Sequence, residues 1–198
     1  MKLIVATVVA GAVLSLAGAA HAQTAAFKCP ATGTEFTYKT SGPDSIVVAT
    51  GQEGSQAGNV CLSRSTSGGR TATVRVHWGL IGSVDPAGES FVQGIDLKSL
   101  WPLKVGNRTT QTVSATGRDG KAYSSTVTMT VAAFEKVTVP AGTFDAFRVE
   151  ETKAGEATPR IHWWAPSLAI SVKETFPDWT DRSKLKVYEL SAVKPAAK

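Results

Sequence analysis

The sequence predicts an all-β protein of antiparallel strands, and two observations carry that prediction. Segments rich in Val and Thr alternate apolar and polar residues, which is the two-residue period of a half-buried strand. Groups containing Gly, Pro, Asp or Ser separate these segments roughly every 8–12 residues, a spacing typical of all-β domains. We therefore expect an antiparallel curled sheet, an open barrel or a β-sandwich, with at most one short helical turn.

Residues 1–22 have the composition of an export signal. Lys2 gives a positive start, an apolar Ala/Gly-rich run follows, and A-H-A before Gln23 is a small-x-small cleavage site. We expect cleavage to leave a single β-rich domain, 23–198, that is periplasmic or secreted and has no stable membrane span. An uncleaved anchor is the alternative, because the run is about as long as a short spanning helix.

The two cysteines, Cys29 and Cys61, are expected to form a disulfide, because the count is even and the export signal implies an oxidising compartment. The bond would close a loop of about 30 residues and stabilise the fold by about 3–4 kcal/mol in the chain-entropy model. A metal site that adds His77 and His162 is the alternative. These four residues lack the short pairwise spacings of common zinc sites, so we expect no metal and no cofactor.

The first half of the domain is expected to consist of strands joined by polar turns. The predicted strands are 35–39, 45–50, 59–64 and 71–78. S-G-P-D is a turn signal before the second of them, and the polar, glycine-rich segments 51–58 and 65–70 are expected to be connections. Residues 79–94 are expected to be irregular.

The second half begins with the expected helical turn at 96–103, where Asp96 is a plausible cap and Pro102 stops the helix. A second feature is the hairpin at 137–150, where Pro140 and Gly142 break a strand into a tight turn. The other predicted strands are 107–116 and 121–131, which form a hairpin around G-R-D-G, then 133–139, 159–164, 169–175 and 185–193.

A short repeated segment supplies candidate binding residues. R-V-H-W at 75–78 recurs as R-I-H-W at 160–163, and each strand places its Arg and His on one face. A two-fold site built from Arg75, His77, Arg160 and His162 is one interpretation. The other, which we favour, is that these are two similar strands whose Trp and aliphatic residues pack the core.

Trp164 is a further candidate. Because Trp163 and Trp164 are successive residues of a strand, their side chains must point to opposite faces of the sheet. One can therefore be core while Trp164 lines an apolar groove on a concave face. A plain core for both is the alternative, and we favour it.

Common catalytic motifs are missing from the sequence. It contains no nucleophile elbow, G-x-G-x-x-G, P-loop or H-E-x-x-H. His77 and His162 are the only histidines after the expected signal, so a hydrolase would use one of them with a neighbouring carboxylate. The acidic residues considered for such a pair are Asp96, Asp145, Glu150, Glu151 and Glu174. The basic residues are scattered, so nucleic acid is not an expected partner.

Three segments carry a resemblance: W-P-L-K-V-G at 101–106, V-T-V-P-A-G-T-F-D-A-F-R-V-E at 137–150 and W-W-A-P at 163–166. Together they resemble a family of uncharacterised exported bacterial proteins, over roughly residues 100–190. The chain departs from that pattern at Ser167 and Ala169, where the family tends to have glycines. The resemblance implies a Gram-negative envelope location and a β-rich fold, and it brings no catalytic residues.

Taken together, these observations predict a non-enzymatic periplasmic or secreted domain that binds an apolar small molecule or an envelope protein. The alternatives are a hydrolase that uses His77 or His162 and a structural component of a surface assembly. The candidate binding residues are Arg75, His77, Arg160, His162 and Trp164.

Overall fold

The computed structural model describes residues 23–55, 58–85, 91–93, 95–116, 121–178 and 181–197, so the expected export signal lies outside the described residues. The strands are β1 (Thr24–Ala25), β2 (Glu35–Lys39), β3 (Ser45–Ser55), β4 (Gly58–Ser67), β5 (Arg70–His77), β6 (Ile81–Asp85), β7 (Phe91–Gln93), β8 (Leu103–Lys104), β9 (Arg108–Thr116), β10 (Ala122–Val139), β11 (Gly142–Lys153), β12 (Arg160–Ala165), β13 (Ile170–Pro177) and β14 (Leu185–Lys194). The one helical turn is η1 (Lys98–Leu100).

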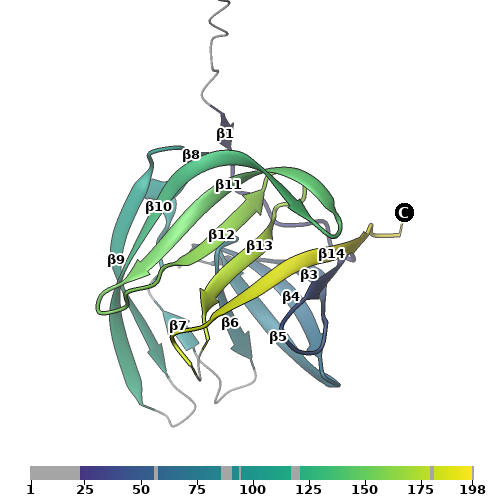
Figure 1. Ribbon diagram of the computed structural model, residues 1–198, viewed down its shortest axis with the longest axis horizontal. Coiled ribbons are helices and arrows are strands. Elements are labelled where there is room, and N and C mark those ends of the chain that lie inside the picture. The colour runs from purple at the N-terminus through teal and green to yellow at the C-terminus, as the bar shows by residue number, and fades with distance from the viewer. Residues whose placement is uncertain are drawn as a thin grey trace, which may run out of the picture.

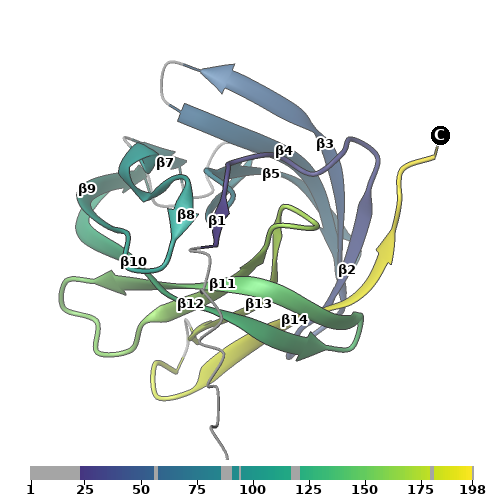
Figure 2. The same ribbon diagram turned by 90° about the horizontal axis from the view of Figure 1, so that it is seen from above.

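These strands form one 12-stranded antiparallel sheet in the order β6-β5-β4-β3-β2-β14-β13-β12-β11-β10-β9-β7, with β1 and β8 paired beside it. The sheet curls around an interior, which is clearest when it is seen from above (Figure 2). Within the described part of the chain the end strands β6 and β7 do not pair with each other, so the curl is not closed into a barrel. The all-β prediction is confirmed, and the architecture is the curled sheet.

One ladder joins the two halves of the chain. Strands β2 to β6 follow each other along one side of the sheet, and β9 to β14 follow each other along the other. The sides meet where β2 pairs with β14, in the register Phe36↔Val193 and Tyr38↔Leu190. In Figure 1, β14 crosses in front of the N-terminal strands that continue the sheet behind it.

The hairpin predicted at 137–150 is present. β10 and β11 pair up to Val139↔Gly142, which leaves Pro140 and Ala141 as the turn. Gly142 has φ 134, a backbone angle that favours glycine. The tip of the hairpin packs towards β14, because the Ala141 N–H donates to the Leu190 carbonyl oxygen at 3.0 Å.

Three predicted connections are in fact partly or largely strand. In the predicted connection 65–70, β4 continues to Ser67 and β5 begins at Arg70. β3 continues to Ser55 and pairs with the beginning of β4, so the described part of 51–58 is strand; residues 56 and 57 lie outside the described residues. β6 and β7 likewise occupy part of 79–94. In these places the backbone hydrogen bonds come from a neighbouring strand, and that pairing outweighs the weak local preference of a Gly- and Ser-rich segment.

The helical turn lies where it was predicted. Asp96 Oδ1 accepts a hydrogen bond from the Lys98 N–H at 3.0 Å, and Leu100 is fully buried. The turn belongs to a core cluster that includes Trp164, Phe147 and Met129 and fills one part of the interior. The disulfide Cys29–Cys61 is present, as expected, and ties the start of the described chain to β4.

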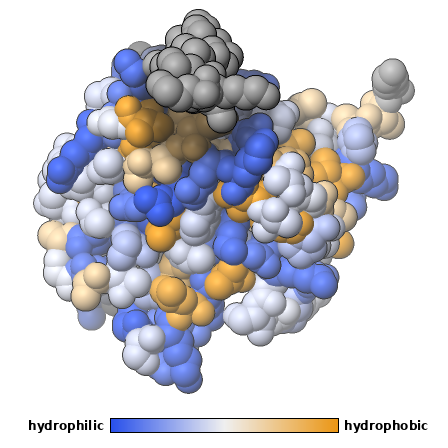
Figure 3. Space-filling model, turned by 45° about the horizontal axis from the view of Figure 1, so that its top comes forward, coloured by the Kyte–Doolittle hydropathy of each residue, from blue (hydrophilic) through white to orange (hydrophobic). Residues whose placement is uncertain are grey.

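The outside of the molecule is mixed in character. On the face shown in Figure 3, hydrophobic residues lie in small groups separated by hydrophilic ones. In the described residues no helix is long and apolar enough to cross a membrane.

Candidate functional site

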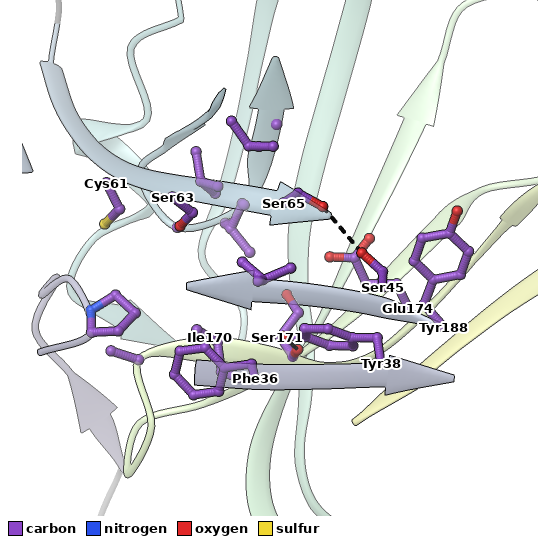
Figure 4. A pocket seen from close by; sticks show the side chains of 18 of the residues that line it. Phe36, Tyr38, Ser45, Cys61, Ser63, Ser65, Ile170, Ser171, Glu174 and Tyr188 are labelled. Atoms are coloured by element: carbon purple, nitrogen blue, oxygen red, sulfur yellow. Dashed lines mark hydrogen bonds between the residues drawn. The ribbon is translucent and has the colours of Figure 1, made fainter. Parts of the chain in front are cut away.

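A cavity of about 260 Å³ lies inside the curled sheet (Figure 4). Its walls come from strands on both sides of the β2–β14 ladder, and each strand contributes mainly every second residue, as alternation requires. Most of the wall is apolar, and its main apolar residues are Phe36, Val47, Val74, Val76, Leu80 and Ile170. A space of this size is close to the smallest pockets that hold small molecules, which begin at about 300 Å³.

The two ends of the cavity differ in chemistry. Cys61, Phe36 and Ile170 lie towards one end of the cavity, and Ser65 and Glu174 face the space at the other (Figure 4). At the polar end the hydroxyls of Ser45 and Ser65 form a hydrogen bond with each other, and their oxygen atoms are 3.1 Å apart. Ser63 lies between the two ends on β4 and is buried. The cavity is therefore amphipathic along its length.

Tyr38 and Tyr188 add aromatic walls. The Tyr38 hydroxyl donates to the carbonyl oxygen of Ser171 at 2.9 Å. Burial, helped by the charge of Glu174, raises the pKa of Tyr38 far above its usual range, so this phenol stays neutral. Tyr188 packs edge-on against Phe176, with ring centroids 5.0 Å apart. These rings are fixed by contacts and give the polar end a defined shape.

A buried charged group adjoins the polar end. Register places His162 of β12 opposite Val149 of β11 on one side and Glu174 of β13 on the other. His162 Nδ1 lies 3.3 Å from Glu174 Oε1, and His162 Nε2 lies 3.4 Å from Glu151 Oε2. The Nδ1 contact is an ion pair without hydrogen-bond alignment. The His162 ring is completely buried, and Glu151 is 4% exposed.

The two carboxylates set the protonation state of this group. Burial alone would lower the pKa of His162, but the charges of Glu174 and Glu151 outweigh it and raise that pKa. Burial would likewise raise the pKa of Glu151, but the hydrogen bond and charge of His162 lower it. The ring is therefore an imidazolium at neutral pH, with no lone pair to accept a proton. It balances charge inside the protein and is not poised as a general base.

Two further cations lie beside these carboxylates. Lys153 Nζ is 3.6 Å from Glu151 Oε1. Arg160 is opposite Glu151 in the ladder, and its guanidinium carbon lies 4.9 Å from the centroid of the Phe176 ring. Arg160 also lines the cavity together with Glu174, so two members of the charged group form part of the wall at the polar end.

The structure brings together only half of the predicted two-fold site. On β12, Arg160 and His162 share the interior face, as alternation requires. On β5 it is Val74 and Val76 that line the cavity, so Arg75 and its neighbour His77 point to the opposite face. The repeated R-x-H-W segments therefore present opposite faces to the interior.

Trp164 lies on the same face of β12 as His162 and is completely buried. Its ring packs edge-on against Trp101 at 5.0 Å, within a core of aromatic and aliphatic side chains. It is not among the described residues that line the cavity, although Gly79, which does line it, lies against its indole. Trp163 points the other way and donates from Nε1 to Glu135 Oε1 at 2.7 Å.

Sequence reasoning missed the hydroxyls of the cavity. Ser63 and Ser65 follow Cys61 at intervals of two residues on β4, so all three share one face. A cysteine expected to form an internal disulfide marks that face as interior, and this was the available signal. Among the described residues, no group of three or more His, Cys, Asp or Glu side chains is arranged to hold a metal ion.

No protein-family model matches the sequence, so the family resemblance drawn from its motifs stays a prediction. No curated protein matches it either. Among solved structures, the chain is similar to YmcC of Escherichia coli K12, described as a hypothetical lipoprotein, with 16% identity and a TM-score of 0.49 over 83% of this chain and 85% of that one.

Two other solved structures are similar at the same level. One is a protein of Bacteroides fragilis described as exported and as having a YmcC-like fold, with 13% identity and a TM-score of 0.46 over 86% of this chain and 99% of that one. The other is a protein of Parabacteroides distasonis described as a lipoprotein, with 11% identity and a TM-score of 0.45 over 87% of this chain and 100% of that one.

Proposed function

We propose that this protein is a non-enzymatic, exported binding domain that holds a small, mainly apolar molecule inside its curled sheet. The observation that carries the proposal is the cavity of about 260 Å³, whose wall is mostly aliphatic and aromatic with a few hydroxyl and charged groups at one end. This combination is typical of small-molecule sites, where apolar walls supply affinity and a few polar groups fix orientation.

The construction of the walls supports the same proposal. The lining side chains stand on paired strands of one continuous sheet, and the disulfide Cys29–Cys61 fixes the apolar end. Walls held in this way change little when a ligand enters, so binding costs little ordering of the protein. The export signal predicted at 1–22, together with that disulfide, supports a periplasmic or secreted location.

Thermal unfolding in the presence of 1-octanol tests the proposal. A ligand present at ten times its Kd stabilises the folded state by about 1.4 kcal/mol, which raises the Tm of a domain of this size by roughly 3–6 °C. The variant Val74→Phe places a larger side chain in the cavity and should abolish the shift. Thr73→Phe on the opposite, exposed face is the matched control and should keep it.

Two results would overturn the proposal. One is a wild-type Tm that 1-octanol does not raise. The other is a shift of the same size in folded Val74→Phe, because the alcohol would then bind elsewhere. Should Val74→Phe fail to fold, Val74→Leu, a smaller increase in volume at the same position of the wall, should weaken octanol binding in calorimetric titration and gives the same comparison.

A further inference from the structure

A carboxylate, that of Glu174, forms part of the cavity wall. Glu174 stands on β13 and belongs to the buried charged group, yet 28% of its side chain is exposed. In Figure 4 it faces the space at the polar end, opposite the end where Cys61 lies. An ionised carboxylate can only accept hydrogen bonds. A ligand that contacts this part of the wall therefore has to supply a donor.

The charge of Glu174 is compensated by cations of the protein. His162 Nδ1 lies 3.3 Å from its Oε1, and Arg160 lines the same cavity. Burial would raise the pKa of Glu174, but the positive charges of His162 and Arg160 outweigh it and lower that pKa. Arg160 also lowers the pKa of Glu151 through its charge. The Glu174 carboxylate is therefore ionised at neutral pH, and Arg160 is engaged with two carboxylates.

This balance is unfavourable to a ligand head group with a net charge. An anionic head group would lie beside Glu174, and it would compete for Arg160 with the two carboxylates that already attract it. A cationic head group would meet Arg160 and the charged ring of His162. A charge partly removed from water is costly unless an opposite charge accompanies it, and here the opposite charges are already shared. A neutral head group avoids both costs.

The serine hydroxyls at the polar end suit such a head group. The oxygen atoms of Ser45 and Ser65 are 3.1 Å apart, and one O–H group is enough to form the hydrogen bond between them. The other O–H group can therefore donate to an oxygen atom of a ligand. The Tyr38 hydroxyl, by contrast, already donates to the Ser171 carbonyl oxygen. The polar end thus offers an ionised acceptor and a neutral donor.

We infer that the cavity takes a neutral amphiphile whose head group donates a hydrogen bond to the Glu174 carboxylate, with its apolar chain directed towards Phe36 and Cys61. This inference rests on the proposed function and deepens it by naming the ligand class. Counting about 30 Å³ for each non-hydrogen atom, as for a water molecule, the cavity of about 260 Å³ holds roughly nine such atoms. Heptanamide, with nine, is the matching probe, because its N–H groups can donate to Glu174 and its carbonyl oxygen can accept from a serine.

Calorimetric titration of the wild-type protein at pH 7 with four probes of this size tests the inference. Heptanamide and N,N-dimethylpentanamide are isomers, and only the first has N–H donors. Heptanoate carries a negative head group and octylammonium a positive one. A hydrogen bond to a carboxylate should make heptanamide bind about tenfold to a hundredfold more tightly than its isomer. Both charged probes should bind more weakly than heptanamide.

Glu174→Gln replaces the ionised acceptor with a neutral amide of the same shape. The preference for heptanamide over its isomer should fall several-fold in this variant, because a neutral acceptor forms a weaker hydrogen bond. Heptanoate should bind more tightly than it does to the wild type, because the negative charge beside its head group is gone. Glu189→Gln is the matched control. Glu189 lies on the neighbouring strand β14, pairs with Lys173 at 2.8 Å and is not among the described residues that line the cavity, so this variant should keep the wild-type order.

The outcomes separate the inference from the proposed function. If the two isomers bind the wild type equally, or a charged probe binds most tightly, the assignment of a neutral donor is wrong and the binding function stands. A folded Glu174→Gln variant that keeps the full preference for heptanamide also overturns the assignment. If none of the four probes binds although 1-octanol does, the inference alone fails; if 1-octanol does not bind either, the proposed function fails. The comparison of isomers uses only the wild-type protein, so it decides the matter even where a variant does not fold.

Discussion

Replacing Glu151 with Gln removes one charge from the centre of the buried group with almost no change in side-chain volume. Glu151 is 4% exposed and lies 3.4 Å from His162 and 3.6 Å from Lys153. Without it, the imidazolium keeps only Glu174 as a counter-ion. Breaking a buried ion pair costs about 3–5 kcal/mol. Because one carboxylate remains, we expect a loss near the lower limit, about 3 kcal/mol of unfolding free energy at pH 6.

The pH dependence gives the same magnitude by a separate route. The carboxylates raise the pKa of His162 from its ordinary value near 6.5 to about 9. A raised pKa contributes stability that is fully present below pH 6.5 and is lost as the pH rises to about 9. At about 1.4 kcal/mol for each tenfold change in the protonation equilibrium, that contribution is about 3 kcal/mol. Glu151→Gln should lower this pKa, so its stability should change less over the same range.

Urea unfolding at pH 6, 7.5 and 9 measures both effects. The control is Glu150→Gln, the next residue, whose carboxylate pairs with Arg148 at 3.3 Å and is 34% exposed. Exposed and half-exposed ion pairs contribute about 0–1 kcal/mol to stability. The unfolding free energy of this variant should therefore differ little from that of the wild type at any of the three pH values.

Two results would refute the reasoning. One is a Glu151→Gln variant no less stable than Glu150→Gln at pH 6. The other is a wild-type stability that does not fall between pH 6.5 and 9 relative to the Glu151→Gln variant. Either result would mean that Glu151 does not stabilise a positive charge on His162 in the folded protein.

Three further predictions concern the scaffold. Replacing Cys29 and Cys61 together with Ser should lower the unfolding free energy by about 3–4 kcal/mol in guanidinium denaturation, and an unchanged midpoint would contradict this. Trp164→Ala should cost about 3–5 kcal/mol, because the whole indole is buried, and a Tm within 2 °C or so of the wild type would contradict it. Gly79→Ala should be more destabilising than Gly69→Ala in the same assay. Both glycines have a positive φ, 70 at Gly79 and 77 at Gly69, so the backbone strain of an alanine should be similar at the two positions. Only at Gly79 would the new Cβ meet another side chain, the Trp164 indole nitrogen at 3.0 Å. Equal losses of stability in the two variants would show that this contact is unimportant.

Elements that are bounded by turn-forming or hydrogen-bonding residues nearby in the chain could be predicted from the sequence. S-G-P-D fixes the boundary after β2, and Pro140 and Gly142 fix the β10–β11 turn. Asp96 marks the helical turn through a hydrogen bond within its own segment. In each case the residues that determine the conformation are adjacent in the chain. The strands β6 and β7 could not be predicted in this way, because their hydrogen bonds are supplied by β5 and β9.

The candidate site shows a second limit. Alternation correctly groups Arg160 with His162, and Arg75 with His77, but it does not say which face of a strand is interior. That choice depends on how the sheet curls. It places valines inside on β5 and charged residues inside on β12, so two nearly identical segments have different roles. The two carboxylates that contact His162 could not be predicted from the sequence either, because Glu151 and Glu174 become its neighbours only through the register of β11, β12 and β13.

The pairing of β2 with β14 has a consequence for the order in which the strands of the sheet pair during folding. The other ladders between strands of the large sheet join segments close in sequence, whereas this one brings Ser191 to the carbonyl of Thr37 across 154 residues. Contacts at such separation form slowly because a long loop must close first. A chain that crosses a membrane from its N-terminus first would therefore wait with β2 as an unpaired strand edge until its last segment emerges. During that interval, the backbone N–H and C=O groups on this edge of β2 lack their β14 partners, and an unpaired strand edge of this kind is prone to aggregation.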